Sequence, residues 1–542
     1  MDYKIKGNIV DAFSREIFPA ELIVEKSRIV RIKRINEELK DFILPGLIDA
    51  HVHIESSMLV PSEFSRIAVR HGTIGAIADP HEIANVSGIK GIDFMIENGK
   101  SVPFKFFFGA PSCVPATKFE NSGAELDSGC IEKLMKRDDI FFLSEVMNFP
   151  GVINGDVEVL KKIDHAIRNK KPIDGHAPGV IGNDLKKYIQ AGISTDHETI
   201  DINEAEEKIH GGMKLLIREG SAAKGFDIFA PLIDVYPDSV MLCTDDIHPD
   251  DLVSGHINKL FVRGVQLGID VFNLIRAACI NPVLHYKLPV GLLREGDMAD
   301  MIIVENLTDF RIAKTYINGQ RVFDMGDVLF QGDIIDHDSQ FRNELVNAEE
   351  LKIKSAGNKI RVIRAVDGEL VTGSLTTAPL IKNGFAVSDP VRDILKIAVA
   401  NRYKNSPMAK GFVNGFGLKE GAIACSIAHD SHNIIAVGVN DLDIAEAINT
   451  IIDMKGGLAV VLPGTTKKMV LEIAGLMTFQ KGEEVASSYR ELDSFAKKIG
   501  SSLTSPFMTL SFMSLLVIPE LKISDRGIFD GNIFAYTELF TD

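Results

Sequence analysis

The residues of this 542-residue chain best suited to chemistry are histidines and carboxylates that follow short apolar runs. His51 and His53 form an HxH pair directly after the run LPGLIDA. Alternate residues at a strand end point to the same side, so both imidazoles can face one cavity. Neutral imidazole is the commonest metal ligand, although most HxH pairs taken alone are surface or core histidines. The pair therefore indicates a metal site only if further ligands converge on it.

Four further residues stand at the ends of later apolar runs: Glu145, His176, His197 and Asp245. Six nitrogen and oxygen ligands are too many for one tetrahedral zinc ion. They fit two adjacent divalent ions with Glu145 between them, and imidazole plus carboxylate without thiolate suits manganese, iron or zinc. Two alternatives remain open, namely that Glu145 is a salt-bridged carboxylate inside the fold and that Asp245 is a helix N-cap.

Such a pair of cations predicts a hydrolytic reaction. Two metal ions lower the pKa of a water molecule between them and supply hydroxide near neutral pH. A carboxylate beside that water can take its proton and return it to a leaving group. Asp245 is the candidate for this proton transfer. We therefore expect metal-assisted hydrolysis with two divalent ions per chain.

The elements that must position these residues are eight apolar runs, each followed by polar or glycine-rich residues. Several intervals between the runs carry a helical pattern, and Val157 to Asn169 shows a period close to 3.6 residues. Eight alternations of strand and helix predict an α/β protein built on a closed parallel (β/α)₈ barrel. The active sites of such barrels lie at the C-terminal ends of the strands, which is where the candidate ligands fall.

The remaining sequence predicts two further parts. Residues 1–44 and 291–350 have β patterns, and we expect them to form the two parts of a small split β-sheet domain, the second followed by a linker. The Asn318-Gly319 pair predicts a tight hairpin turn in this region. Residues 45–290 form the expected barrel domain. Residues 351–542 mix strands and helices and predict a C-terminal α/β domain.

Composition narrows the class of protein. The chain has 59 basic and 75 acidic residues and a net charge of −16, which opposes binding to nucleic acid. No stretch of about 18 uncharged apolar residues predicts a membrane span. The N-terminal segment has no apolar run typical of a signal peptide, and five scattered cysteines without a CxxC pair suit a reducing compartment. We expect a cytoplasmic protein that forms a homo-oligomer.

Several motifs, in order along the chain, resemble the amidohydrolase superfamily and, within it, the adenine deaminases. They are HVHIESSM, ADPHEIANVSG, SEVMNFPGV, DGHAPG, TDHE, REGSAA, LCTDDIHPDDL and, in the last domain, IAHDSHNIIAVGVN. The resemblance implies a barrel with a small β domain and a C-terminal domain. It also implies a dinuclear metal site, preferably of manganese with iron or zinc as alternatives, and hydrolysis of adenine to hypoxanthine and ammonia in purine salvage.

The resemblance assigns roles to the six residues already identified by position: His51, His53, Glu145, His176, His197 and Asp245. Glu145 stands where many amidohydrolases carry a carboxylated lysine. Asp245 resembles the last metal ligand and proton carrier of the family. The other deaminase type combines an H-x-E with a P-C-x-x-C signature, and this sequence contains no P-C-x-x-C.

Residues that contact the substrate are harder to identify from sequence. Polar residues at other strand ends are candidates for binding the purine ring: His81, Glu82, Arg218, Ser221 and Asp246. Each has a structural alternative, such as a helix cap for Glu82 or Asp246, or a rim salt bridge between Arg218 and Glu219. Glu55 and Ser56 follow the HxH pair and are candidates for supporting the ligands. The segment His429–His432 is either a lid over the barrel or a satisfied turn.

Two other functions remain open at this point. One is a different amidohydrolase that cleaves a cyclic amide or an N-acyl substrate, because such an enzyme shares the metal ligands and differs only in its pocket. The other is a metal-binding or assembly protein without catalytic activity. The intact ligand set argues against the second alternative.

Overall fold

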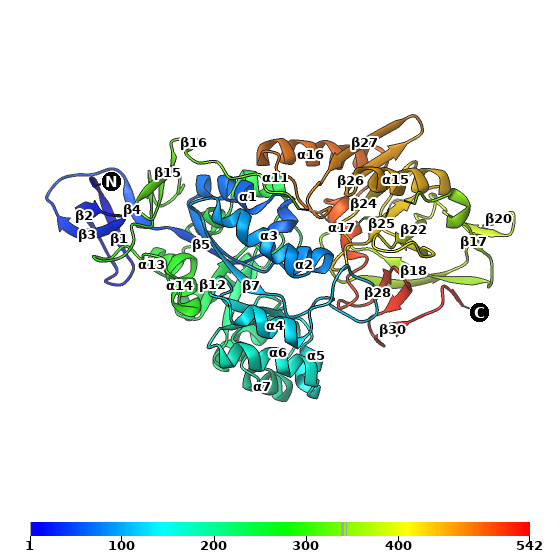
Figure 1. Cartoon of the computed structure of the whole chain (residues 1–542), viewed down its shortest axis with the longest axis horizontal. Helices are drawn as coiled ribbons and strands as arrows, with labels where there is room; N and C mark the ends of the chain where they lie inside the picture. The colour runs from blue at the N-terminus through cyan, green and yellow to red at the C-terminus, as the bar shows by residue number, and fades with distance from the viewer. Residues whose placement is uncertain (1, 338–340, 343, 542) are drawn as a thin grey trace. The chain divides into compact units, whose positions relative to one another are not determined.

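The structure is a computed structural model that describes residues 2–337, 341–342 and 344–541 (Figure 1). It divides into two compact units. The first comprises Met1–Pro80, Asp93–Ser112 and Asp127–Ile335, and the second comprises His81–Ile92, Cys113–Leu126 and Asp336–Asp542. Two segments within the expected barrel range, residues 81–92 and 113–126, thus group with the C-terminal part of the chain.

Eight parallel strands form the centre of the first unit. They are β5 (Leu47–Val52), β6 (Thr73–Ala78), β7 (Lys105–Ala110), β8 (Phe142–Val146), β9 (Ile173–Gly175), β10 (Thr195–Asp196), β11 (Lys214–Arg218) and β12 (Val240–Cys243). β5–β9 pair in chain order, as do β10–β12. The amide of Ser194 donates to the carbonyl of Ile173 at 2.9 Å, and Val52 pairs in parallel with Asp245. These two links close the barrel, and the predicted α/β fold class is confirmed.

Helices surround these strands. The helix predicted over residues 157–169 forms as α6 (Val157–Arg168), but Val157 and Ile167 of its apolar period are exposed. In α6, the side chain of Asp156 caps the first turn, and Ile163 and Ala166 are buried. The other helices of this unit are α1 (Pro61–Ala68), α4 (Ser128–Met135), α5 (Phe149–Asn154), α7 (Gly182–Gln190), α8 (Ile202–His210), α9 (Phe226–Phe229), α10 (Leu232–Val235), α11 (Pro249–Ser254), α12 (Ile257–Gln266), α13 (Val271–Ile275) and α14 (Asn281–Tyr286).

A second sheet in the first unit joins the N-terminal strands to strands that follow the barrel. Its order is β16-β15-β14-β13-β4-β1-β2-β3. The strands are β1 (Tyr3–Asp11), β2 (Glu16–Glu25), β3 (Arg28–Arg34), β4 (Phe42–Pro45), β13 (Met301–Val304), β14 (Ile312–Ile317), β15 (Gln320–Asp324) and β16 (Asp327–Val328). The turn between β14 and β15 uses Asn318 and Gly319, both with positive φ, as the hairpin prediction requires.

The second unit contains a nine-stranded sheet. Its main path is β19-β18-β23-β22-β25-β24-β26-β27, with β31 also paired to β18. α15 (Asp441–Met454) packs on β24, β25 and β26 through a buried face that includes Ile444, Ile448 and Ile451. The nine strands are β18 (Lys359–Arg364), β19 (Gly373–Thr377), β22 (Leu395–Ala400), β23 (Ala409–Asn414), β24 (Ala422–Cys425), β25 (Ile434–Gly438), β26 (Gly457–Leu462), β27 (Thr465–Val470) and β31 (Phe540–Thr541).

Smaller elements complete the described chain. α2 (His81–Ser87) belongs to the second unit, and α3 (Ile89–Lys100) spans the division between the two units. The second unit also contains α16 (Gly482–Lys498), α17 (Pro506–Phe512), β17 (Ile353–Lys354), β20 (Leu380–Lys382), β21 (Phe385–Val387), β28 (Leu521–Ser524), β29 (Gly527–Asp530) and β30 (Ala535–Tyr536). Among the described residues, no helix is both long and apolar enough to cross a membrane.

Candidate metal centre

The six predicted ligands all lie in the first unit, at or just beyond the C-terminal ends of barrel strands. None is more than 9% exposed: His51, His53, Glu145, His176, His197 and Asp245. Buried imidazoles and carboxylates need partners, because transfer of a charge from water into the interior is costly. Their separations show whether cations would fit between them.

Three of these residues can share one cation. His51 Nε2 lies 3.2 Å from His53 Nε2 and 3.4 Å from Asp245 Oδ1, and His53 Nε2 lies 3.1 Å from the same Asp245 oxygen. Ligand atoms bound to one ion at about 2.1 Å lie about 3.0 to 3.5 Å from one another. The donor set therefore fits a divalent cation.

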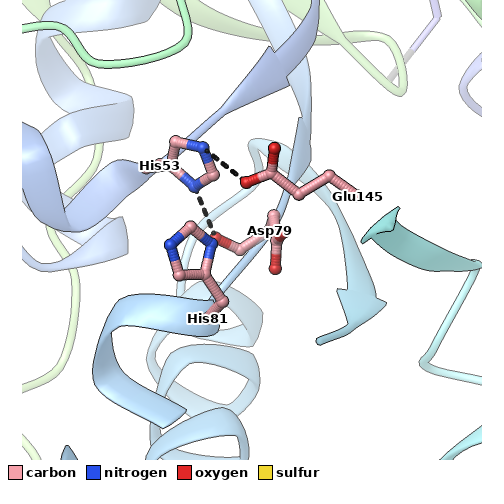
Figure 2. Close-up of side chains that lie close together, drawn as sticks. All are labelled: His53, Asp79, His81 and Glu145. Atoms are coloured by element: carbon pink, nitrogen blue, oxygen red, sulfur yellow. Dashed lines mark hydrogen bonds and ion pairs between the residues drawn. The ribbon is translucent and has the colours of Figure 1, made fainter. Parts of the chain in front are cut away.

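Glu145 faces two groups of histidines with its two oxygens. Oε1 lies 3.4 Å from His53 Nε2, a contact that Figure 2 shows, whereas Oε2 lies 2.6 Å from His176 Nδ1 and 3.1 Å from His197 Nε2. A carboxylate in this position can bridge a cation held by the HxH pair and a second cation held by His176 and His197. The geometry fits the dinuclear arrangement expected from the sequence.

The electrostatics of the site also favour cations. Burial alone raises the pKa of Glu145, but His176 and His197 outweigh this effect and hold the pKa well below its usual value. Burial likewise acts against ionised Asp245, yet hydrogen bonds from His51 and His53 hold its pKa well below the usual range. The neighbouring imidazoles thus favour the ionised form of both carboxylates, which is the form that binds a metal ion.

Arg218 contacts carboxylates on either side of it. Its guanidinium donates to both oxygens of Glu198 and to Asp245 Oδ2. The rim salt bridge considered from the sequence does not form, because Glu219 pairs with Arg263 instead. Glu198, whose side chain is buried, was not among the predicted residues. The signal that could have identified it is its place in the TDHE motif, directly after His197 at a strand end.

Comparison with known proteins supports the resemblance over the whole chain. Residues 42–322 match the amidohydrolase family, and residues 369–535 match the adenine deaminase C-terminal domain. The adenine deaminase of Methanosarcina mazei is 54% identical over 552 residues, covering 99% of this chain and 100% of that protein. That of Salinibacter ruber is 49% identical and covers 100% of this chain and 99% of its own length.

The chain belongs to the adenine deaminase family of amidohydrolases. A solved β-aspartyl dipeptidase from Fervidobacterium islandicum AW-1 also matches 62% of this chain and all of its own, with 13% identity and a TM-score of 0.45. Membership of the adenine deaminase family confirms the resemblance inferred from the motifs.

Asp79 is a further polar residue near the predicted metal-ligating residues of this adenine deaminase family member. It follows β6, and its backbone carbonyl lies 3.2 Å from His53 Nδ1. Its buried carboxylate comes within 4.8 Å of ligand atoms of His53 and Glu145 (Figure 2). Sequence reasoning passed over this aspartate, although its place at the end of the second apolar run is the signal that identified the other ligands.

Ser221 and Asp246, predicted to contact the purine, have protein partners near the barrel strand ends. Ser221 Oγ donates to Asp251 Oδ2 at 2.6 Å and accepts from the amide of His248, just before α11. Asp246 Oδ1 accepts from Ser56 Oγ at 2.5 Å. Glu55, beside Ser56, is buried in the same short turn.

The other two predicted substrate residues, His81 and Glu82, begin α2 in the second unit. Within that unit, His81 Nε2 lies 3.7 Å from Asp430 Oδ1, and Glu82 Oε1 lies 3.5 Å from His429 Nδ1. All four side chains are buried, as is His432. The His429–His432 segment therefore contributes to a buried polar cluster within the second unit.

Proposed function

We propose that this chain hydrolyses adenine to hypoxanthine and ammonia, using two divalent cations held by the six buried ligands of the barrel. The observation that carries the proposal is about 50% identity, over full length, to proteins named adenine deaminase. The convergence of imidazoles and carboxylates on two adjacent positions supports it independently, because hydrolytic deamination needs an activated water molecule.

The proposed roles follow from the position of each side chain. His51, His53 and Asp245 would hold one cation, His176 and His197 the other, and Glu145 would bridge them. When bound, two divalent cations lower the pKa of a water molecule to near 7 and stabilise the charge that develops on its oxygen. The nitrogen and oxygen donors suit manganese, with iron and zinc as alternatives.

Asp245 is the proposed proton carrier. Its carboxylate accepts a proton from the attacking water, whose oxygen adds to C6 of adenine. Asp245 passes this proton to N1 of the purine, then takes the second proton from the new hydroxyl on C6 and gives it to the exocyclic amine. The amine leaves as ammonia, and the C6 oxygen remains as the carbonyl of hypoxanthine. The ionised state of this carboxylate, favoured by its neighbours, is the state that a base requires.

Four of the predicted residues are proposed to bind the purine ring. Asp246 adjoins the proton carrier in sequence, and Ser56 holds one of its oxygens, which fixes its orientation. His81 and Glu82 remain candidates to donate to and accept from ring nitrogens. Ser221, three residues beyond β11, remains a candidate as well. A variant of any of these that contacts the ring should raise KM for adenine.

The experiment that tests the function is metal reconstitution followed by an ammonia assay. The purified chain is stripped with a chelator and reloaded separately with manganese, iron(II) or zinc. We expect about two ions per chain by mass spectrometry and ammonia release from adenine, with little from a hydantoin or an N-acyl amino acid. Turnover of either of those two compounds in preference to adenine would favour the other amidohydrolase function.

The same preparations can test the remaining expectations. We propose that the protein acts in the cytoplasm as a homo-oligomer of dimer size or larger, without a nucleic-acid partner. Sedimentation of the loaded protein gives its mass in solution. Comparing adenosine with adenine shows whether the site accepts a nucleoside.

A further inference from the structure

Three neighbouring barrel strands bring Glu198, Arg218 and Asp245 together. Glu198 lies two residues beyond β10, Arg218 is the last residue of β11, and Asp245 lies two residues beyond β12. β10, β11 and β12 pair in that order, and Arg218 stands opposite Cys243 in the register. The central strand thus places a guanidinium between carboxylates from the strands on either side.

The contacts form a continuous bridge. Arg218 Nη1 donates to Glu198 Oε1 and, at 2.8 Å, to Asp245 Oδ2, while Nη2 donates to Glu198 Oε2 at 2.9 Å. Glu198 and Asp245 are 6% and 4% exposed, so neither carboxylate is well solvated. A planar guanidinium that forks onto one carboxylate and also binds a second fixes both in orientation as well as in charge.

The bridge determines which oxygen of Asp245 faces the proposed cation. Arg218 occupies Oδ2, and Oδ1 is the oxygen that lies 3.4 Å from His51 Nε2 and 3.1 Å from His53 Nε2. At the other end, Glu198 Oε1 lies 3.9 Å from a ring nitrogen of His176. The bridge therefore extends from the ligands of one proposed cation to those of the other.

We propose that Arg218 and Glu198 are positioning residues, which hold Asp245 in the orientation that binds a cation and carries the proton, and that Arg218 does not bind the purine. The proton-carrying part rests on the proposed function, whereas the orientation of Asp245 does not. Three of the hydrogen bonds that Arg218 can donate are already directed at carboxylates, which is the geometry of support rather than of substrate recognition.

A measurement of metal affinity can distinguish an orienting role of Arg218 from an effect of its positive charge alone. Removing the positive charge of Arg218 next to a cation site should tighten cation binding if charge alone matters. If Arg218 orients Asp245, its removal should instead weaken binding, because partners of metal ligands contribute about 10- to 100-fold to affinity. The two explanations predict opposite signs for Arg218→Met.

The first experiment measures manganese affinity by competition with a chromophoric chelator. We expect Arg218→Met to bind manganese about 10- to 100-fold more weakly than wild type. Arg218→Lys should also be impaired, because an ammonium group cannot span two carboxylates in the same way. Tighter binding by Arg218→Met, or wild-type affinity in Arg218→Lys, would overturn the proposal. Arg263→Met, which removes an arginine that pairs with Glu219 and Asp227, serves as the matched control.

The second experiment uses kinetics with adenine at saturating manganese. Positioning predicts a fall in kcat of about 10- to 100-fold for Arg218→Met and Glu198→Gln with KM changed less than about threefold. The double variant should be no slower than the slower single variant, because the two residues act as one unit. A rise in KM with unchanged kcat would assign Arg218 to purine binding and overturn the proposal.

The two measurements also separate this inference from the proposed function. If wild type releases no ammonia from adenine, the function fails, and the manganese competition still tests the orientation of Asp245. Circular dichroism of each metal-free variant establishes that it is folded. If Arg218→Met does not fold, Arg218→Lys and Glu198→Gln decide the outcome by the same criteria.

Discussion

The backbone amide of Asp245 donates a 2.9 Å hydrogen bond to the carbonyl of His51, and Asp245 Oδ1 lies 3.4 Å from His51 Nε2. The first and last strands of the barrel therefore meet through the same two residues that would share a cation. Asp245 adopts a left-handed backbone conformation with a φ of 57° at this junction. The hydrogen bond that joins the two ends of the barrel therefore also fixes the position of the last metal ligand.

This junction predicts different outcomes for two substitutions of Asp245. Asparagine tolerates positive φ nearly as well as aspartate, whereas a β-branched residue does not. We expect Asp245→Asn to keep a near-wild-type melting temperature, and Asp245→Val to be destabilised by about 1–3 kcal/mol. Because an amide cannot carry the proton, Asp245→Asn should still lose at least about 100-fold in kcat.

Melting curves of both variants test the stability prediction, and the ammonia assay tests the loss of kcat. More than a tenth of wild-type turnover in Asp245→Asn would contradict the proton-carrier role.

Glu145 gives a prediction about metal content. Its two oxygens face different histidines, so glutamine would present an amide N–H to one side where a cation needs an acceptor. We expect Glu145→Gln to retain about one ion or fewer and to lose at least about 100-fold in activity. Mass spectrometry of the purified protein measures the ions. Glu132→Gln, an exposed position on α4, is the matched control and should retain two. Two tightly held ions in Glu145→Gln would refute the bridging role.

Much of the barrel could be predicted because the sequence patterns that indicate its strands lie within short segments of the chain. Each apolar run ends in polar residues at the point where a buried strand ends, and parallel strands bring those ends to one edge. This is why His176 and His197 could be placed together from sequence. The Asn318-Gly319 turn and the 3.6-residue period of α6 could be predicted for the same reason, because each pattern lies within a short segment.

The supporting contacts could not be predicted in the same way. The Glu198–Arg218 pair joins residues 20 positions apart, whereas the sequence suggested the neighbouring Glu219 as the partner of Arg218. Register between β10 and β11 decides the choice, and register is a property of the assembled sheet. The grouping of residues 81–92 with the C-terminal part is likewise set by long-range packing, which no local pattern reports.

Asp49 gives a prediction about stability. It is fully buried on β5, accepts from the amide and hydroxyl of Thr244, and lies 2.9 Å from His256 Nε2. Removing one member of a buried charged network costs about 3–5 kcal/mol, because its partners are left without an acceptor. We expect this loss for Asp49→Ala in urea unfolding. Asp164→Ala, which removes an exposed ion pair on α6, should cost less than about 1 kcal/mol. Equal effects would contradict this account of Asp49.

Lys522 predicts a dependence of stability on pH in the second unit. The side chain is fully buried on β28, and its Nζ donates to the carbonyls of Leu370 at 2.7 Å and Phe512 at 3.0 Å. Burial lowers the pKa of this amine from 10.5 to about 7. Between these values the unfolded chain binds a proton that the folded protein does not. The free energy of unfolding therefore rises as pH increases from about 7 to about 10, by up to about 1.4 kcal/mol per pH unit from this residue.

The variant Lys522→Met isolates that contribution, because all other titrating groups are shared with wild type. At each pH, both proteins are unfolded in urea, and the exchange of amide hydrogens in β28 is used to monitor unfolding. This gives the free energy of unfolding of both proteins. We expect wild type to gain stability relative to Lys522→Met steadily between pH 7 and pH 9.5. Below pH 6 the difference should become constant, because the amine is then protonated in both folded and unfolded states. A difference that does not change with pH would mean that Lys522 stays charged in the folded protein, with its two carbonyl contacts sufficient to replace water.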